Sequence, residues 1–182
     1  SIVPRPVAFV TTMNDDGVVN GAPFSFFNVV SSNPPMISVS IQRKQGVMKD
    51  TARNIAANGE LVVHIVSEEF VGQINETAAN LPPHESELVR AGLTQVASTV
   101  VQVPGVKEAK VRMECKLEQM VTLGGDDNGP GCDLIIARVE QYHIDEAIYA
   151  DGRVDLEGLD AVSRLAGNDY AKIGRVMTIE RP

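Results

Sequence analysis

Hydroxyl-bearing and cationic side chains between positions 38 and 51 have the composition of a phosphate site. Ser38 and Ser40 lie in an apolar, β-prone run, and Arg43, Lys49 and Thr51 follow where a helix is expected to begin. Hydroxyls, cations and the free N–H groups of a helix N-terminus are the groups with which proteins hold phosphate. The same residues could equally form a polar strand face, two surface cations and an ordinary helix cap. Spacing alone leaves both readings open.

A phenylalanine-rich loop comes shortly before this cluster. The chain has five phenylalanines and no tryptophan, and Phe24, Phe26 and Phe27 all fall within residues 22–28. Such a loop could lie along a flat ring, with Ser25 and backbone amides bonding the polar rim of that ring. Taken in isolation, however, the pattern favours phenylalanines that plug the end of a barrel. Next to a phosphate seat, the aromatic loop suggests a phosphorylated aromatic cofactor.

Other chemistries have weaker support. Cys115 and Cys132 have no closely spaced partner and are typical of ordinary thiols in a reducing compartment, which favours the cytoplasm. The histidines are scattered without ligand spacing, so no metal site is expected, although His143 at a strand end could reach a cleft. No Gly-x-Ser-x-Gly elbow, Walker-type loop or GxGxxG after a strand occurs.

Composition sets further bounds. The 182 residues suit one domain, and 43% hydrophobic with 22% charged residues is ordinary globular composition. A net charge of −8 argues against nucleic-acid or anionic-membrane partners. The apolar runs fall short of the ~18–20 residues that a membrane helix needs. Because the chain begins at Ser1, we expect N-terminal residues to be missing.

Short strands and tight turns with a few helices predict an antiparallel barrel, mainly β with helices. A doubly wound parallel sheet would need regular strand–helix alternation, which is absent. Asp50 is expected to cap the first helix, and Pro23 to end the second strand and open the aromatic loop. The expected strands are 7–13, 18–22, 36–41, 61–66, 111–122 and 133–144, and the expected helices are 50–58, 67–79 (ended by Pro82 and Pro83) and 84–91.

Several segments taken together resemble the flavin reductase-like family, proteins with the FMN-binding split β-barrel fold. These segments are residues 1–12, 17–28, 31–36 and 49–55, and residues 164–170 look like the family's closing Arg-Leu-Gly-Gly-x-x-Tyr motif. Ala166 stands where a glycine is more usual. The family includes flavoredoxin and the reductase components of two-component monooxygenases. The match is dense over the first third of the chain and looser beyond it, and it implies one such domain over residues 1–182.

The resemblance implies a homodimer that binds FMN near the subunit interface, and it reverses the isolated reading of the phenylalanine loop. Some positions would lie along the isoalloxazine or the ribityl chain, others would hold the phosphate and ribityl hydroxyls, and Tyr170 would close the site. The first group is Arg5, Thr12, Ser25, Phe26, Phe27 and Asn28, and the second is Ser40, Arg43, Lys49, Asp50 and Thr51.

The implied activity is hydride transfer from NADH or NADPH to the flavin N5, with a monooxygenase or another redox protein as possible partner. The family's better-known reductases carry a histidine late in the chain near the nicotinamide, and no histidine follows His143 here. The alternative is a flavoredoxin-like FMN electron carrier that a protein partner reduces. A third reading is a structural or heme-binding relative without flavin.

Overall fold

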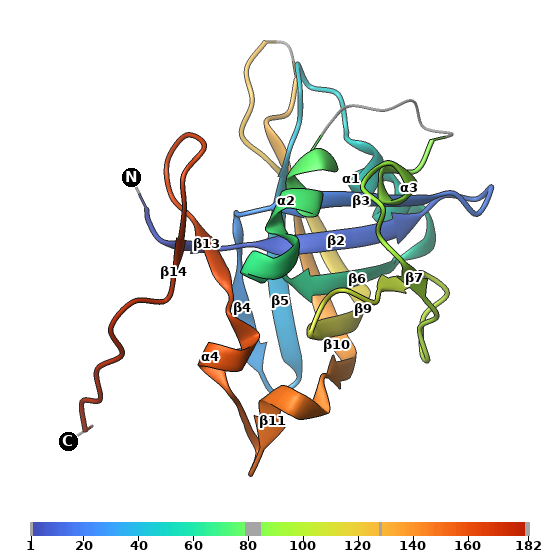
Figure 1. Cartoon of the computed structure of the whole chain (residues 1–182). Coiled ribbons are helices and arrows are strands. Elements are labelled where there is room, and N and C mark those ends of the chain that lie inside the picture. Colours follow the sequence, from blue (N-terminus) through green and yellow to red (C-terminus); the bar gives the residue numbers. More distant parts are fainter. Residues whose placement is uncertain (1, 79–84, 128, 181–182) are drawn as a thin grey trace.

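A seven-stranded antiparallel sheet forms the centre of the computed structural model, which describes residues 2–78, 85–127 and 129–180 (Figure 1). The strand order is β3-β2-β6-β9-β10-β5-β4, and within the described residues β3 and β4 do not pair with each other. The sheet therefore curls around one interior but remains open between these two edges. The bounds are β2 Ala8–Met13, β3 Val19–Phe24, β4 Phe27–Ser32, β5 Pro35–Gln42, β6 Glu60–Ile65, β9 Val111–Leu123 and β10 Cys132–Ile144.

Strand β2 is buried on both faces, which explains its nearly continuous apolar sequence. Ala8 and Val10 point into the cluster inside the curled sheet. Phe9 points the other way, into a second cluster that includes Ile74 and Leu88 from the covering helices. The inner face of the curled sheet thus packs against itself, and helices cover part of its outer face.

Strand β5 follows the alternation predicted from its sequence. Ile37, Val39 and Ile41 are buried in the interior cluster, whereas Ser38 and Ser40 lie on the other face and are half-buried. Alternate residues of a strand face opposite sides of the sheet, so one face is apolar and the other carries the hydroxyls. The prediction of a hydroxylic face opposite a buried one is confirmed.

Two predictions about the aromatic loop are wrong. Pro23 does not end the second strand: β3 continues to Phe24, and Pro23 pairs with Phe9 of β2. Proline is tolerated there because β3 is an edge strand and needs no N–H toward its outer side. Residues 27–32, expected as loop, form β4, which pairs with β5, so the irregular connection shrinks to Ser25 and Phe26.

Helix α1 (Asp50–Asn58) agrees with prediction except at its cap. Its N-cap is Lys49 and not Asp50, and no side chain caps its first N–H groups. Asp50 lies inside the first turn, where its carboxylate pairs with Arg53 three residues later. Gly59 ends the helix in the left-handed conformation, with φ of 73°.

The remaining elements are short. Helices α2 (Glu68–Glu76) and α3 (Glu87–Arg90) cover the outer face of the sheet near β2 and β3 (Figure 1). Helix α2 ends at Glu76, before the predicted end at Ala79, and α3 begins at Glu87, after the predicted start at His84. The positions Ala79, Pro82, Pro83 and His84 themselves lie outside the described residues. The others are β1 Arg5–Pro6, β7 Gln95–Val96, β8 Gly105–Val106, the 3₁₀ helix η1 Glu146–Ile148, β11 Tyr149–Ala150, β12 Arg153–Val154, α4 Leu156–Leu159, β13 Val162–Arg164 and β14 Tyr170–Lys172.

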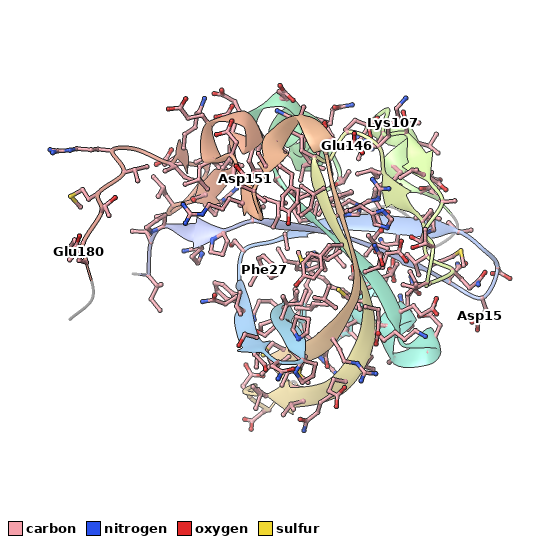
Figure 2. The ribbon with its side chains drawn as sticks, turned by 90° about the horizontal axis from the view of Figure 1, so that it is seen from below. Asp15, Phe27, Lys107, Glu146, Asp151 and Glu180 are labelled. Atoms are coloured by element: carbon pink, nitrogen blue, oxygen red, sulfur yellow. The ribbon has the colours of Figure 1, made fainter. Side chains whose placement is uncertain are left out.

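Strands β1, β13 and β14 form a small sheet that brings the two ends of the chain together. Arg5 pairs with Arg164, and Arg164 pairs with Tyr170. Beyond β14 the chain runs away from the body of the molecule, and Figure 2 shows Glu180 near the end of this extension. None of the helices in the described ranges has the length and apolar character needed to span a membrane.

Candidate functional site

Two hollows adjoin beside the Ser25–Phe26 connection between the sheet edges. One has a volume of about 420 Å³ and the other of about 530 Å³. Pro23, Phe24 and Ala78 line both of them, so they form a continuous depression, which we call the central groove. Its lysine end includes Asn20, Ala22, Lys44, Met48, Lys49 and Thr51, and its arginine end includes Arg5, Val7, Ser25, Phe26, Arg164 and Tyr170.

Two cations without partners characterise the lysine end. The side chains of Lys44 and Lys49 are exposed, and no described residue forms an ion pair or hydrogen bond with either ammonium group. Lys49 is also the N-cap of α1, whose first-turn N–H groups have no side-chain cap. Unpaired cations beside an uncapped helix N-terminus favour an anionic ligand at this end of the groove.

A buried network of polar side chains lies between the lysine end and the sheet. The Asn20 Oδ1 accepts hydrogen bonds from Thr51 Oγ1 at 2.9 Å and Thr12 Oγ1 at 3.4 Å. The Asn20 Nδ2 donates to Glu87 Oε2 at 3.0 Å, and Asn54 Nδ2 donates to Thr12 Oγ1 at 3.1 Å. Because these residues come from β2, β3, α1 and α3, the network fixes the start of α1 against the sheet.

Arg43 is already engaged within the protein. Its Nε and Nη2 donate to the two carboxylate oxygens of Asp133 at 2.9 and 2.6 Å, and its Nη1 donates to the Gly46 carbonyl at 3.1 Å. The Asp133 side chain is fully buried. A fork-to-fork pair of this kind is geometrically specific. Arg43 therefore anchors the 43–47 loop that carries Lys44, and its predicted contact with a phosphate stays a prediction.

Guanidinium groups and aromatic rings form the arginine end. Arg5 Nε donates to Ser25 Oγ at 3.3 Å, Arg5 Nη2 donates to the Leu165 carbonyl at 2.8 Å, and its guanidinium lies 5.6 Å from the centre of the Phe26 ring. Phe26 is 53% exposed. An exposed ring held in place by a cation offers a flat apolar surface to a ligand.

The closing segment supplies the other wall of this end. The Arg164 guanidinium lies 4.6 Å from the centre of the Tyr170 ring and donates to the Gly167 carbonyl. Both residues line the hollow with Arg5, which pairs with Arg164 across β1 and β13. The first and last parts of the sequence motif series are therefore neighbours in space.

The structure brings together seven of the twelve residues predicted for the site. These seven line the central groove: Arg5, Ser25, Phe26, Lys49, Asp50, Thr51 and Tyr170. The other five do not line it. Thr12 belongs to the buried network, Phe27 packs against the interior cluster, Asn28 bonds its neighbour's N–H on β4, Ser40 accepts from Gln42, and Arg43 binds Asp133.

Four residues of the groove and its support were missed. Lys44 belongs to the basic loop, and Arg164 opens the closing motif, so each carried a signal in the sequence. Asn20 stands just before the aromatic loop, and no local sequence pattern indicates its role. Glu87 comes from a distant helix, and only the tertiary fold brings it to Asn20. Within the described ranges, no group of three or more His, Cys, Asp or Glu side chains is arranged to hold a metal.

Comparison with known proteins finds a family model and a relative that match most or all of this chain. The model of the flavin reductase like domain matches residues 1–156. The chain is 52% identical to the uncharacterized protein YwrF of Bacillus subtilis (strain 168), over 100% of this chain and 90% of that protein.

Solved structures agree with the family match. The crystal structure of nitrilotriacetate monooxygenase component B from Bacillus cereus matches with a TM-score of 0.96 and 57% identity, covering 98% of this chain and 89% of that one. The flavoredoxin of Desulfovibrio vulgaris (Miyazaki F) matches in fold, with a TM-score of 0.82 and 22% identity, covering 98% and 91%. The predicted mainly β, split-barrel fold is confirmed.

Proposed function

Because the chain belongs to the flavin reductase-like family, we propose that it is an FMN-binding oxidoreductase that NADH or NADPH reduces. One observation carries the proposal. At one end the central groove has two lysines without a partner among the described residues and an uncapped helix N-terminus, and at the other it has aromatic rings with guanidinium groups. FMN has a matching arrangement, with an anionic phosphate at one end and a flat ring system at the other.

The residues of the groove fit such a group. Lys44, Lys49 and the first N–H groups of α1 would hold the phosphate, and the hydrogen bond from Thr51 to Asn20 would keep the start of α1 in place. The residues Arg5, Ser25, Phe26 and Tyr170 would hold the ring. Bound flavin would supply the redox chemistry by accepting a hydride at N5, while the protein supplies placement.

The predicted site residues outside the groove have supporting roles in this proposal. Thr12 orients Asn20 and Asn54, and Arg43 fixes the loop before Lys49. Ser40 donates its N–H to the Phe26 carbonyl at 2.8 Å and so fixes the connection that bears the exposed ring. Phe27 and Asn28 anchor the end of that connection in β4.

We extend the proposal to assembly and location. Edge strand β4 exposes Val29 by 71% and Val30 by 50%, which suits a homodimer formed along this strand. Similarity to a monooxygenase component B supports a monooxygenase as the acceptor of reduced flavin. Free Cys115 and Cys132 are consistent with the reducing cytoplasm.

The test is anaerobic reduction of the purified protein loaded with FMN. Addition of NADH or NADPH should bleach the flavin absorbance, and the faster of the two reductants identifies the preferred coenzyme. A flavin absorbance that persists with both nucleotides and disappears only with dithionite would contradict the reductase proposal.

That outcome would favour the second candidate, a flavoredoxin-like electron carrier reduced by another protein. The absence of a histidine after His143 favours it, and the net charge of −8 suits a basic protein partner. The carrier should retain FMN through gel filtration, whereas a reductase that uses FMN as a substrate should release it. A protein that ignores added FMN in a fluorescence titration would contradict both candidates.

A further inference from the structure

A separate hollow of about 420 Å³ lies where β9 begins and β10 ends. Its walls include Lys107, Lys110, Arg112, Tyr142, His143 and Asp145, and we call it the β9–β10 hollow. It shares no lining residue with the central groove. Arg112 and His143 are paired directly across the two strands, so the ladder places a guanidinium and an imidazole side by side.

Arg112 has a buried donor without an acceptor. Its Nε is buried and has no hydrogen-bond partner within the described part of the chain. The side chain lies over Gly105, where an added Cβ would come within 2.9 Å of Arg112 Cδ and 3.0 Å of His64 Nε2. Burial lowers the pKa of Arg112, which the nearby Glu114 carboxylate partly offsets. A buried N–H donor without a hydrogen-bond acceptor is unfavourable. Arg112 is half-buried and lines the hollow, so a ligand there can accept hydrogen bonds from the accessible part of its guanidinium.

His143 is fixed beside Arg112 by a buried carboxylate. The His143 Nε2 lies 2.5 Å from Glu114 Oε1, and the Glu114 side chain is fully buried. Burial raises the pKa of Glu114, but hydrogen bonds from the backbone of Thr99 and Val100 outweigh it, and the pKa falls to about 2. The carboxylate therefore stays charged and accepts the Nε2 hydrogen of the imidazole, so the ring's Nδ1 can donate to a ligand when the ring is doubly protonated.

The other charges around the hollow are unequally engaged. Lys110 Nζ donates to the Gly158 carbonyl at 2.9 Å and pairs with Glu69 at 3.1 Å. The Asp145 carboxylate accepts the N–H of Ala147 at 2.9 Å and so caps the η1 turn. Lys107 is exposed and has no partner among the described residues, and Figure 2 shows it at the periphery of the molecule. Lys107 and Arg112 are therefore the cations available to a ligand, and Asp145 keeps its negative charge in the wall of the hollow.

We propose that the β9–β10 hollow is a second binding site, for the phosphate group of a small molecule, held by Lys107, Arg112 and His143. Arg112 supplies directional guanidinium donors, and Lys107 supplies a mobile point charge at the mouth. A local site of this kind within a chain of net charge −8 is specific to small anions, because the rest of the surface repels polyanions. The proposal does not depend on flavin binding.

The test is isothermal titration calorimetry with inorganic phosphate as the probe. Lys49→Met serves as the background, so that the lysine end of the central groove contributes little. We expect one phosphate per chain, with an affinity lowered about tenfold or more by Arg112→Met and severalfold by Lys107→Met, as for the loss of charge-assisted hydrogen bonds. Lys116→Met, an exposed lysine on the same strand outside the hollow, is the matched control and should leave the affinity unchanged.

Two results would overturn the proposal. One is no binding heat up to about 10 mM phosphate, which is tenfold above a Kd of about 1 mM. The other is equal weakening by Lys107→Met and Lys116→Met. Lys107 is exposed, so its variant is expected to fold even where Arg112→Met does not, and thermal melting checks both variants. Phosphate binding that disappears on addition of FMN would also contradict a separate site.

Discussion

The lysine end of the central groove and the buried carboxylate of Glu114 differ in whether their charged groups have partners within the described part of the protein. Glu114 is fully buried, and it accepts hydrogen bonds from three successive backbone N–H groups, residues 99–101, and pairs with His143. Lys44 and Lys49 have no partner among the described residues, although they line a hollow. A charge satisfied by its own fold stabilises the structure, whereas charges left unsatisfied in a hollow are available for a ligand.

The largest expected effect is the loss of folding stability when the hydrogen-bonded carboxylate of Glu114 is removed. Glu114→Ala should lower the free energy of unfolding by about 3–5 kcal/mol, because it removes the acceptor of the buried Val101 N–H and of the part-buried N–H groups of Thr99 and Val100. Urea denaturation measures this loss. Glu118→Ala, at an exposed position on the same strand, is the control and should change stability by less than about 0.5 kcal/mol. Equal losses would show that Glu114 does not hold the 99–101 loop.

Buried His64, whose two ring nitrogens are both hydrogen-bonded, should make the stability of the fold depend on pH. Its Nδ1 lies 2.9 Å from the Phe9 carbonyl, and its Nε2 accepts the Val106 N–H at 3.0 Å, so the ring is neutral. Burial lowers its pKa from 6.5 to about 4. Between these values the unfolded chain binds a proton that the folded chain does not, so stability falls as the pH drops from 6.5 toward 4.

The expected loss across that window is about 3 kcal/mol, since each pKa unit corresponds to ~1.4 kcal/mol. Denaturation curves at pH 7 and at pH 4.5 test it. His64→Gln can still donate and accept but does not titrate, so this variant should lose much less stability over the same interval. An equal decline in both proteins would assign the pH dependence to other groups.

Substitutions at the lysine end of the central groove should change ligand affinity with little change in folding stability. Lys49→Met should weaken FMN about tenfold to a hundredfold, because charge-assisted hydrogen bonds contribute ~1.5–3 kcal/mol. Its effect on riboflavin, which lacks the phosphate, should be slight. Fluorescence titrations with both flavins measure the difference. Equal weakening of the two would remove Lys49 from the phosphate site.

The smallest effect is expected at Lys44. This lysine lies in the 43–47 loop on the rim of the groove, so Lys44→Met should weaken FMN only severalfold, and high salt should reduce the difference between variant and parent. Lys116→Met, outside the groove, serves as control in the same fluorescence titration. A larger loss for Lys44→Met than for Lys49→Met would place the phosphate nearer the loop than the helix.

Local patterns predicted most of the fold. The strands expected at 36–41, 111–122 and 133–144 and the helix expected at 50–58 depend on near neighbours, and the structure agrees with each. Glu114, expected on the exposed face of its strand, is instead fully buried because distant backbone N–H groups bind it. Pro23 was misjudged because tolerance for proline depends on whether the strand lies at an edge, which is a property of the whole sheet.

The site was predictable only in part, for a similar reason. Lys49, Thr51 and Phe26 lie in the motif-bearing stretch, and they do line the groove. Arg43 has the same local signals, but Asp133, ninety residues away, occupies its guanidinium. Glu87 reaches Asn20 only through the packing of α3 on β3. Long-range partners decide which charges stay free, and one sequence does not reveal them.

The most direct measurement compares the affinities of the unaltered protein for FMN and for riboflavin at low and high salt. The account predicts that FMN binds at least about tenfold more tightly than riboflavin at low salt, and that the preference shrinks at high salt, because Lys44 and Lys49 recognise the phosphate. Equal affinity for the two flavins at low salt would contradict the central claim that these cations hold a phosphate.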